Sequence, residues 1–141
     1  MTEETLMDLV EKLNQRLSPF AKFIGMRVTA AARDRVTAEL HVSEHHCNPA
    51  SVAHGGCLMA VADNLGAIGT VLNLPQGATT TTLESKTNFL RPVPAGTTLH
   101  GEATPVHLGR RTMVWQTRLT TDTGKLAAVV TQTQMVLPAE G

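Results

Sequence analysis

The chain has 141 residues and a mass of 15.1 kDa, which is enough for one domain with a core and too little for two ordinary domains. Its 42% hydrophobic and 17% charged residues are typical of a folded protein. The formal net charge is +0 and aromatic residues make up only 3%. A neutral chain lacks the basic surface that binds nucleic acid or an anionic membrane. The scarcity of aromatic side chains also argues against stacking on nucleic acid bases.

The cellular setting follows from three features. Two cysteines, Cys47 and Cys57, are too few for a secreted disulfide scaffold. The acidic start lacks the basic stretch that precedes the apolar part of a signal peptide. The long apolar run 55–74 contains Asp63, two asparagines and several glycines, so it predicts a buried helix and not a membrane span. We therefore expect a cytoplasmic protein.

The first third of the chain predicts a helix and two strands. Leucines and a valine at helical spacing predict an amphipathic helix over residues 3–17, with Thr2 as its cap and Ser18-Pro19 as its end. Residues 23–32 and 35–43 predict a pair of strands. In the second strand one face is apolar, with Val36, Ala38, Leu40 and Val42.

The rest of the chain predicts a central helix and four more strands. A polar loop over residues 44–53 precedes a helix over residues 54–74 that is apolar nearly all round, which predicts burial on most sides. Turn residues then separate four predicted strands, 79–91, 97–108, 112–121 and 125–137. In the third of these four, Met113, Trp115, Thr117 and Leu119 mark one face.

This order of elements predicts an α+β fold in one domain, residues 1–141. Because one helix separates the two groups of strands, a repeated βαβ pattern is excluded. The economical arrangement is one curved, mainly antiparallel sheet of six strands wrapped around the central helix. Such a sheet leaves open edges and covers only part of the helix, so we expect a homodimer.

The central helix carries the most informative residues. Gly55-Gly56 at its start would leave first-turn N–H groups open to a ligand oxygen, although a tight turn would also need glycine. Asp63 has no cation three or four residues away, so it is a candidate catalytic carboxylate. The alternative is a structural role at a polar seam, which the neighbouring Asn64 would also suit.

The spacing along this helix decides how a site could be built. Gly55 and Asp63 are separated by about 12 Å at 1.5 Å per residue, so they cannot touch one reacting carbonyl within one chain. Two antiparallel copies of the helix in a symmetric dimer would bring Gly55 of one chain toward Asp63 of the other. If both residues act, the site is shared between subunits.

A histidine and cysteine cluster between His41 and Cys57 suggests other chemistry. The spacing of these residues does not match a zinc finger, and no acidic chelating pair accompanies them, so no metal site is predicted. Cys57 is expected to be a packing residue, with a cysteine nucleophile and a histidine base as an open alternative. The basic residues Lys86, Arg91, Arg110 and Arg111 are each typical of a surface, yet together they could bind the phosphates of an anionic carrier.

The sequence resembles the hotdog-fold acyl-CoA thioesterases, specifically the PaaI-like group, over about residues 20–137. The matching stretches are Asn48-Pro-Ala-Ser-Val-Ala-His54-Gly55-Gly56, the helix Cys57-Leu-Met-Ala-Val-Ala-Asp63-Asn64, Thr87-Asn-Phe-Leu-Arg91-Pro92 and Leu108-Gly109-Arg110-Arg111. The resemblance implies a hotdog fold, a dimer with two shared sites and further assembly into a homotetramer.

The resemblance also implies roles for individual residues. Asp63 matches the catalytic acid, and the Gly55 N–H would polarise the thioester carbonyl. Asn48 and His54 match residues that line this carbonyl or the attacking water. Thr82 matches a hydroxyl that helps to orient the water, with Thr80 and Thr81 as alternatives in register. The positions implied for substrate and coenzyme A binding are Gly56, Arg91, Gly109, Arg110 and Arg111.

The hypothesis is therefore hydrolysis of an acyl-CoA thioester with no metal or redox cofactor. Asp63 would act as general base on water or attack the carbonyl directly. Two rival functions are a hotdog hydratase or dehydratase, which needs an acid–base pair, and a non-catalytic acyl-CoA-binding module. The acyl group, aryl or alkyl, is left open.

Overall fold

The computed structural model describes residues 2–140, so residues 1 and 141 of the expected single domain lie outside the described residues. The elements in chain order are α1 (Glu3–Gln15), α2 (Pro19–Ile24), β1 (Arg27–Ala32), β2 (Arg35–His41), the 3-10 helix η1 (Glu44–His46), α3 (Gly55–Val71), β3 (Thr79–Phe89), β4 (Thr98–Leu108), β5 (Thr112–Thr120) and β6 (Leu126–Leu137). The predicted α+β order is confirmed.

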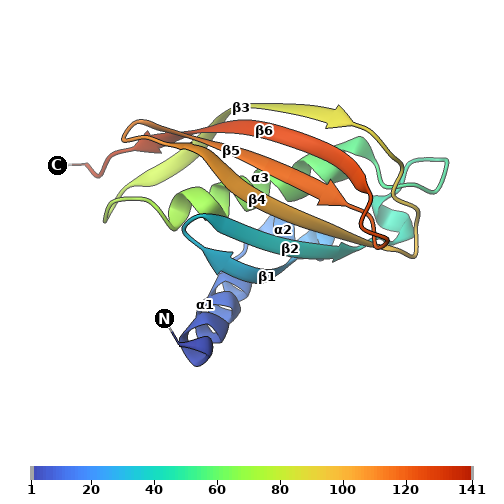
Figure 1. Ribbon diagram of the computed structural model, residues 1–141, viewed down its shortest axis with the longest axis horizontal. Coiled ribbons are helices and arrows are strands. Elements are labelled where there is room, and N and C mark those ends of the chain that lie inside the picture. The colour runs from blue at the N-terminus through green and yellow to red at the C-terminus, as the bar shows by residue number, and fades with distance from the viewer. Residues whose placement is uncertain (1, 141) are drawn as a thin grey trace.

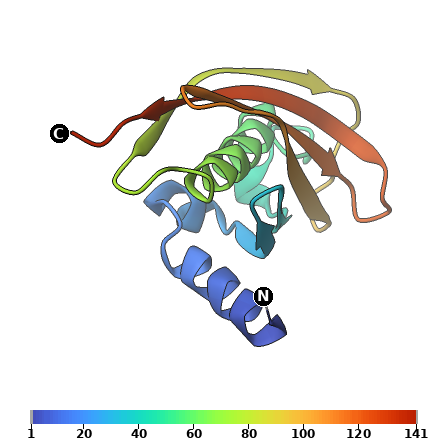
Figure 2. The same cartoon turned by 60° about the vertical axis from the view of Figure 1, so that its left-hand side comes forward.

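The six strands form one antiparallel sheet in the order β1-β2-β4-β5-β6-β3. The sheet curves around α3, which lies across its concave side (Figures 1 and 2). Helix α1 lies on the same side of the sheet as α3 and projects away from it, below β1 (Figures 1 and 2). The expected sheet wrapped around a central helix is thus confirmed, and β1 and β3 are its two edges.

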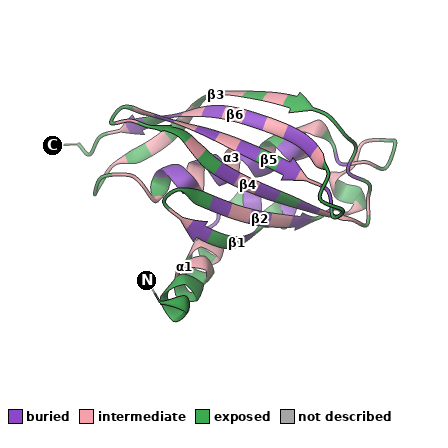
Figure 3. Cartoon of the chain, viewed as in Figure 1, coloured by how far each residue is buried: buried purple, intermediate pink, exposed green. Residues whose placement is uncertain are grey.

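The core lies between α3 and the inner face of the sheet, where alternate strand residues are buried (Figure 3). The apolar faces predicted for two strands are both buried: Val36, Ala38, Leu40 and Val42, and Met113, Trp115, Thr117 and Leu119. Period-2 alternation therefore identified the inner face correctly, because successive strand side chains point to opposite sides.

The segment between α1 and β1 differs from the prediction. Helix α1 ends at Gln15 instead of residue 17, and α2 follows where a strand was expected from residue 23. Pro19 begins this helix instead of only ending the previous one, since proline suits a first helical position and the Ser18 hydroxyl accepts from the Ala21 N–H at 3.1 Å. Gly25, with φ 81°, ends α2 in the left-handed conformation.

Helix α3 is shorter than expected but buried over most of its surface. It ends at Val71 instead of residue 74, where the Asn73 amide donates 2.8 Å hydrogen bonds to the carbonyls of Gly69 and Arg33. Most of its positions are buried or half-buried, as predicted, and the exposed ones are Gly56, Met59 and Val71, the last two at 38% and 54%. Within residues 2–140, no helix combines the length and hydropathy needed to cross a membrane.

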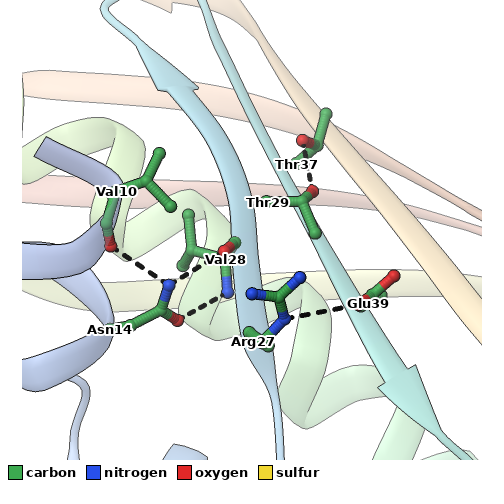
Figure 4. A network of polar contacts seen from close by, with 7 residues as sticks. All are labelled: Val10, Asn14, Arg27, Val28, Thr29, Thr37 and Glu39. Carbon is green, nitrogen blue, oxygen red and sulfur yellow. Dashed lines mark hydrogen bonds and ion pairs between the residues drawn. The ribbon is translucent and has the colours of Figure 1, made fainter. Parts of the chain in front are cut away.

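The β1 edge of the sheet is covered by α1 through one asparagine. The Asn14 side chain accepts from the Val28 N–H at 2.8 Å and donates to the Val28 carbonyl at 2.9 Å and to the Val10 carbonyl at 3.1 Å (Figure 4). The amide therefore makes the pair of hydrogen bonds that a neighbouring strand would make. It satisfies part of an edge that could otherwise pair with another chain.

The β3 edge, in contrast, has no strand beside its outer side in the described chain. β3 is eleven residues long, contains no proline and exposes Leu83, at 55%, on a bulge between Thr82 and Glu84. A long open edge of this kind is a template for pairing with a second strand.

Close approach between α3 and the sheet depends on two helix glycines. A Cβ on Gly69 would lie 2.6–2.8 Å from the six-membered ring of Trp115, and one on Gly66 would lie 2.5 Å from the Gln132 amide. Neither neighbour has room to move, because Trp115 and Gln132 are both 0% exposed.

We expect Gly69→Ala to lower the free energy of unfolding by about 1–3 kcal/mol through overpacking, although alanine favours the helix. Chemical denaturation of single and double variants checks this. Trp115→Phe removes the ring atoms that clash, so the double variant should lose less stability than the two single variants together. Additive losses would contradict the proposed contact.

Candidate active site

Asp63 lies half-buried in the middle of α3 and faces β3 and β6. Its Oδ1 accepts from the Thr82 hydroxyl at 2.8 Å and from the Gln132 amide at 3.3 Å. In the described chain no salt bridge and no hydrogen bond to Oδ2 is formed. One carboxylate oxygen is thus held by neutral donors and the other is open, while the neighbouring Asn64 takes the structural role by bonding Ala60 and Ser18.

A bulge in β3 explains why Thr82 reaches Asp63. Thr80 and Thr82 turn their hydroxyls toward β6 and α3 before the bulge, and Ser85 and Thr87 bury theirs after it. One extra residue, Leu83, changes which alternate positions face inward. Of the three threonines that the sequence left open, Thr82 contacts the acid, and Thr81 is exposed.

Two glutamines on β6 join this site, and sequence reasoning missed both. Gln132 also reaches the Asp63 carbonyl at 3.3 Å, and the Gln134 amide donates to the Thr82 hydroxyl at 2.7 Å. The available signal was their spacing: both occupy the inner face of β6, between Val130 and Val136. Two amides on an otherwise apolar buried face need polar partners.

At the start of α3, the backbone N–H groups of Gly55 and Gly56 differ in their hydrogen bonding. His54 is exposed and caps the helix, its Nδ1 accepting from the Gly56 N–H at 2.8 Å. This hydrogen bond occupies the Gly56 amide, so Gly56 has no free donor for a ligand. The Gly55 N–H, in contrast, has no acceptor among the described residues and lies in the first turn, where helix N–H groups are free.

A small pocket lies against Gly55. It has a volume of roughly 340 Å³, and its lining residues are Ala53, Gly55, Leu58, Phe89, Leu90, Arg91, Pro92 and Val93. The ring of Phe89 would be 3.1 Å from a Cβ on Gly55, so a larger residue would meet this ring. The absent side chain at position 55 therefore leaves space beside a free amide.

Asn48 belongs to the turn that leads into α3. Its Oδ1 accepts from the Ala50 N–H at 2.9 Å, and its N–H donates to the Val52 carbonyl at 2.9 Å. Ser51 completes this turn with a positive φ of 57°. The side-chain oxygen of Asn48 is thus used locally.

The histidine and cysteine cluster has a structural explanation. His46 Nε2 lies 2.6 Å from the Ile24 carbonyl, and Nδ1 accepts from the Ser43 N–H at 2.9 Å, which ties the loop to α2. Within residues 2–140, no group of three or more side chains is arranged to hold a metal ion. Burial, and then the nearby Cys47, raise the pKa of the Cys57 thiol. A raised pKa leaves less thiolate at neutral pH, which disfavours the cysteine nucleophile.

The predicted basic residues do not gather in one chain. Arg91 donates to the Leu126 carbonyl at 3.1 Å at the start of β6, beside the Gly55 pocket. Arg110 and Arg111 lie in the β4–β5 turn. There the backbone carbonyl of Arg111 accepts from the Val136 N–H, at the other end of β6. The length of the strand separates these positions by about 30 Å. Local packing explains the glycine at position 109, since a Cβ there would lie 2.8 Å from the Thr112 carbonyl.

A family model described as the thioesterase superfamily matches residues 50–128, a span that includes Gly55, Asp63 and Thr82. The chain belongs to the thioesterase superfamily. It is therefore a thioester hydrolase, and the resemblance to hotdog-fold thioesterases of the PaaI-like group is confirmed.

The thioesterase has similar relatives in several bacteria. It matches the structure of thioesterase HI1161 from Haemophilus influenzae with a TM-score of 0.88 at 33% identity, covering 94% of this chain and 92% of that chain. For a mutant of the phenylacetic acid degradation protein PaaI from Thermus thermophilus the TM-score is 0.77 at 29% identity, with 84% and 98% covered. The 1,4-dihydroxy-2-naphthoyl-CoA hydrolase of Listeria monocytogenes is 26% identical over 106 residues, 75% of this chain and 85% of the hydrolase.

Proposed function

We propose that this thioesterase hydrolyses acyl-CoA thioesters to the free acid and CoA, with Asp63 as the reacting carboxylate. One observation carries the proposal: Asp63 is the only acidic side chain of α3 among the described residues, it faces the sheet, and its Oδ2 accepts no hydrogen bond there. The CoA hydrolase of Listeria monocytogenes supports the substrate class.

A carboxylate with one open oxygen suits two chemical routes. As a general base, Oδ2 would take a proton from the water that attacks the carbonyl. As a nucleophile, it would attack the carbonyl directly, expel the CoA thiolate and form an anhydride, which water then hydrolyses to the free acid and the restored Asp63 carboxylate. Either route expels CoA as a thiolate, a good leaving group that needs no strong acid at sulfur. A hydratase would need a second acid or base, which the described inner-face positions of one chain do not supply, and the match to the thioesterase superfamily favours hydrolysis.

The Gly55 N–H is the proposed donor to the thioester oxygen. It is free among the described residues, it lies in the first turn of a seventeen-residue helix, and it borders an apolar pocket. The helix dipole and the low dielectric strengthen such a donor as negative charge develops on the oxygen. His54 supports this role by holding the helix start, and Asn48 by shaping the turn before it.

A homodimer would complete the site. If two β3 edges pair antiparallel around Ser85, Phe89 of one chain lies opposite Thr81 of the other, because both are four residues from the centre. Gly55, beneath Phe89, would then approach the second chain's Asp63, beside Thr82. The same two-fold axis would bring Arg91 of one chain to the end that carries Gly109, Arg110 and Arg111 of the other, where they could bind CoA phosphates.

We expect Asp63→Asn and Asp63→Ala to lower kcat by about 10²–10⁴-fold, because neither residue can accept the proton or attack the carbonyl. CoA release from benzoyl-, phenylacetyl- and straight-chain acyl-CoAs measures the loss and identifies the acyl preference. Asp34→Asn, in the β1–β2 turn, is the control and should keep full activity. A folded Asp63→Asn variant with near-wild-type turnover would overturn the role of Asp63.

We expect Gly55→Pro to lower kcat by about 10²–10³-fold, because it removes the proposed oxyanion donor. Proline suits this first helical position, and the extended His54 before it, with ψ 139°, tolerates a following proline. Gly55→Ala is the matched control, since it adds a Cβ against Phe89 but keeps the N–H. Equal losses in both variants would show that the added carbon, and not the missing hydrogen, is responsible.

The shared site is tested by mixing the two inactive variants, Asp63→Asn and Gly55→Pro. Random reassociation makes half of the dimers mixed, and each mixed dimer regains one intact site of two, so about one quarter of wild-type activity should return. Activity is measured before and after the subunits are dissociated and reassociated together. If each site lies within one chain, no activity returns.

A further inference from the structure

The two glutamines of β6 are the most unusual residues around Asp63. Gln132 and Gln134 are 0% and 1% exposed, and both lie on the inner face of the sheet among apolar side chains. A methionine of similar length would fill either place without the cost of burying an amide. Their polar atoms, and not their volume, therefore distinguish them from the rest of the core.

The chemistry of Asp63 sets the direction of each hydrogen bond around it. An ionised carboxylate only accepts, so the single hydroxyl proton of Thr82 points to Oδ1, 2.8 Å away. The Thr82 oxygen must then accept, and it does so from Gln134 Nε2 at 2.7 Å. The Gln134 Oε1 consequently faces the Thr80 hydroxyl at 3.0 Å, and this hydroxyl donates either there or to the Met135 carbonyl at 2.9 Å.

We infer that Gln134, oriented by Thr80, is a positioning residue that keeps the Thr82 proton directed at Asp63 Oδ1 and so leaves Oδ2 free to take a proton or attack in the reaction. The inference rests on the proposed function of Asp63. If the amide of Gln134 were reversed, its oxygen would compete for the Thr82 proton, and Asp63 Oδ1 would lose its shortest hydrogen bond.

Other charged groups around Asp63 are few. The buried positions of β2, β4, β5 and β6 hold no ionisable side chain in the described chain. On β3, Glu84 accepts from Thr133 on the outer face and Lys86 is exposed; on α2, Lys22 donates to the Gln15 carbonyl. On α3 itself, Cys57 lies six residues away, and across the proposed dimer His54 would accompany Gly55.

The test compares Gln134→Met and Gln134→Glu with the wild type in kcat/KM for an acyl-CoA between about pH 4 and 9. The acid limb of this profile reports protonation of the essential base in the free enzyme. Losing the donor disfavours the charged form, so Gln134→Met should move the limb upward by roughly 0.5–1 pH unit, and Gln134→Glu, with a like charge nearby, by about 1 unit or more. Both variants should regain most of their activity above the shifted limb.

Thr80→Val provides a milder variant, with the limb expected to move in the same direction by a smaller amount. Its matched control is Thr104→Val, an exposed threonine on β4 away from the β3 edge, and Gln116→Met on β5 is the control for Gln134→Met. Both controls should keep the wild-type profile. If the Gln134 variants fail to fold, the two threonine variants still decide the question.

The inference is overturned if folded Gln134→Met or Thr80→Val keeps the wild-type acid limb, or loses activity equally at every pH. The ¹³C chemical shift of the Asp63 carboxyl, followed by NMR over the same pH range, gives its protonation without relying on turnover. A wild-type titration in the variants would reject the positioning role alone. Full activity in Asp63→Asn would reject the proposed function instead.

Discussion

The hydrogen bond from the Thr82 hydroxyl to Asp63 is the contact on which the geometry of the candidate site depends. It places a carboxylate against the inner face of a sheet that is largely apolar and, in the described chain, carries no compensating cation. Such a charge is tolerated only where hydrogen bonds replace those of water. The bulge at Leu83, which turns Thr82 inward, and the buried amides of β6 supply these bonds.

Close packing of α3 against the sheet is the second condition for this contact. Gly66 and Gly69 bring the helix backbone close to Gln132 and Trp115, and Gly101 on β4 makes room for Leu65 in the same way. Each helix glycine costs about 1 kcal/mol of helix stability relative to alanine. This cost is reasonable only if the short distance matters, and for Gly66 it lets the Gln132 amide reach both the carbonyl and the carboxylate of Asp63.

Sequence reasoning found the parts of the fold that have a period and the site residues that are chemically isolated. Alternation identified the buried face of β5, and the absence of any nearby cation singled out Asp63. It misread Pro19, since proline both ends one helix and begins the next, and only the Ser18 cap distinguishes the two cases. It missed Gln132 and Gln134, because their meaning depends on which strand lies across from them, and β3 pairs with β6 over a separation of about fifty residues.

The two edges of the sheet differ in a way that bears on assembly. The Asn14 side chain of α1 forms hydrogen bonds with the Val28 N–H and carbonyl on the β1 edge. The outer edge of β3, in contrast, has no partner strand along its eleven residues in the described chain. The uncovered side of α3 lies next to this open edge, with Met59 exposed, and the Gly55 amide and Asp63 are too far apart along the helix to act on one carbonyl. An open edge, an exposed patch on the helix and the two separated parts of the proposed site would all be accounted for by one two-fold axis beside β3. Because one symmetry operation would satisfy all three, the proposed dimer is more economical than a separate partner for each.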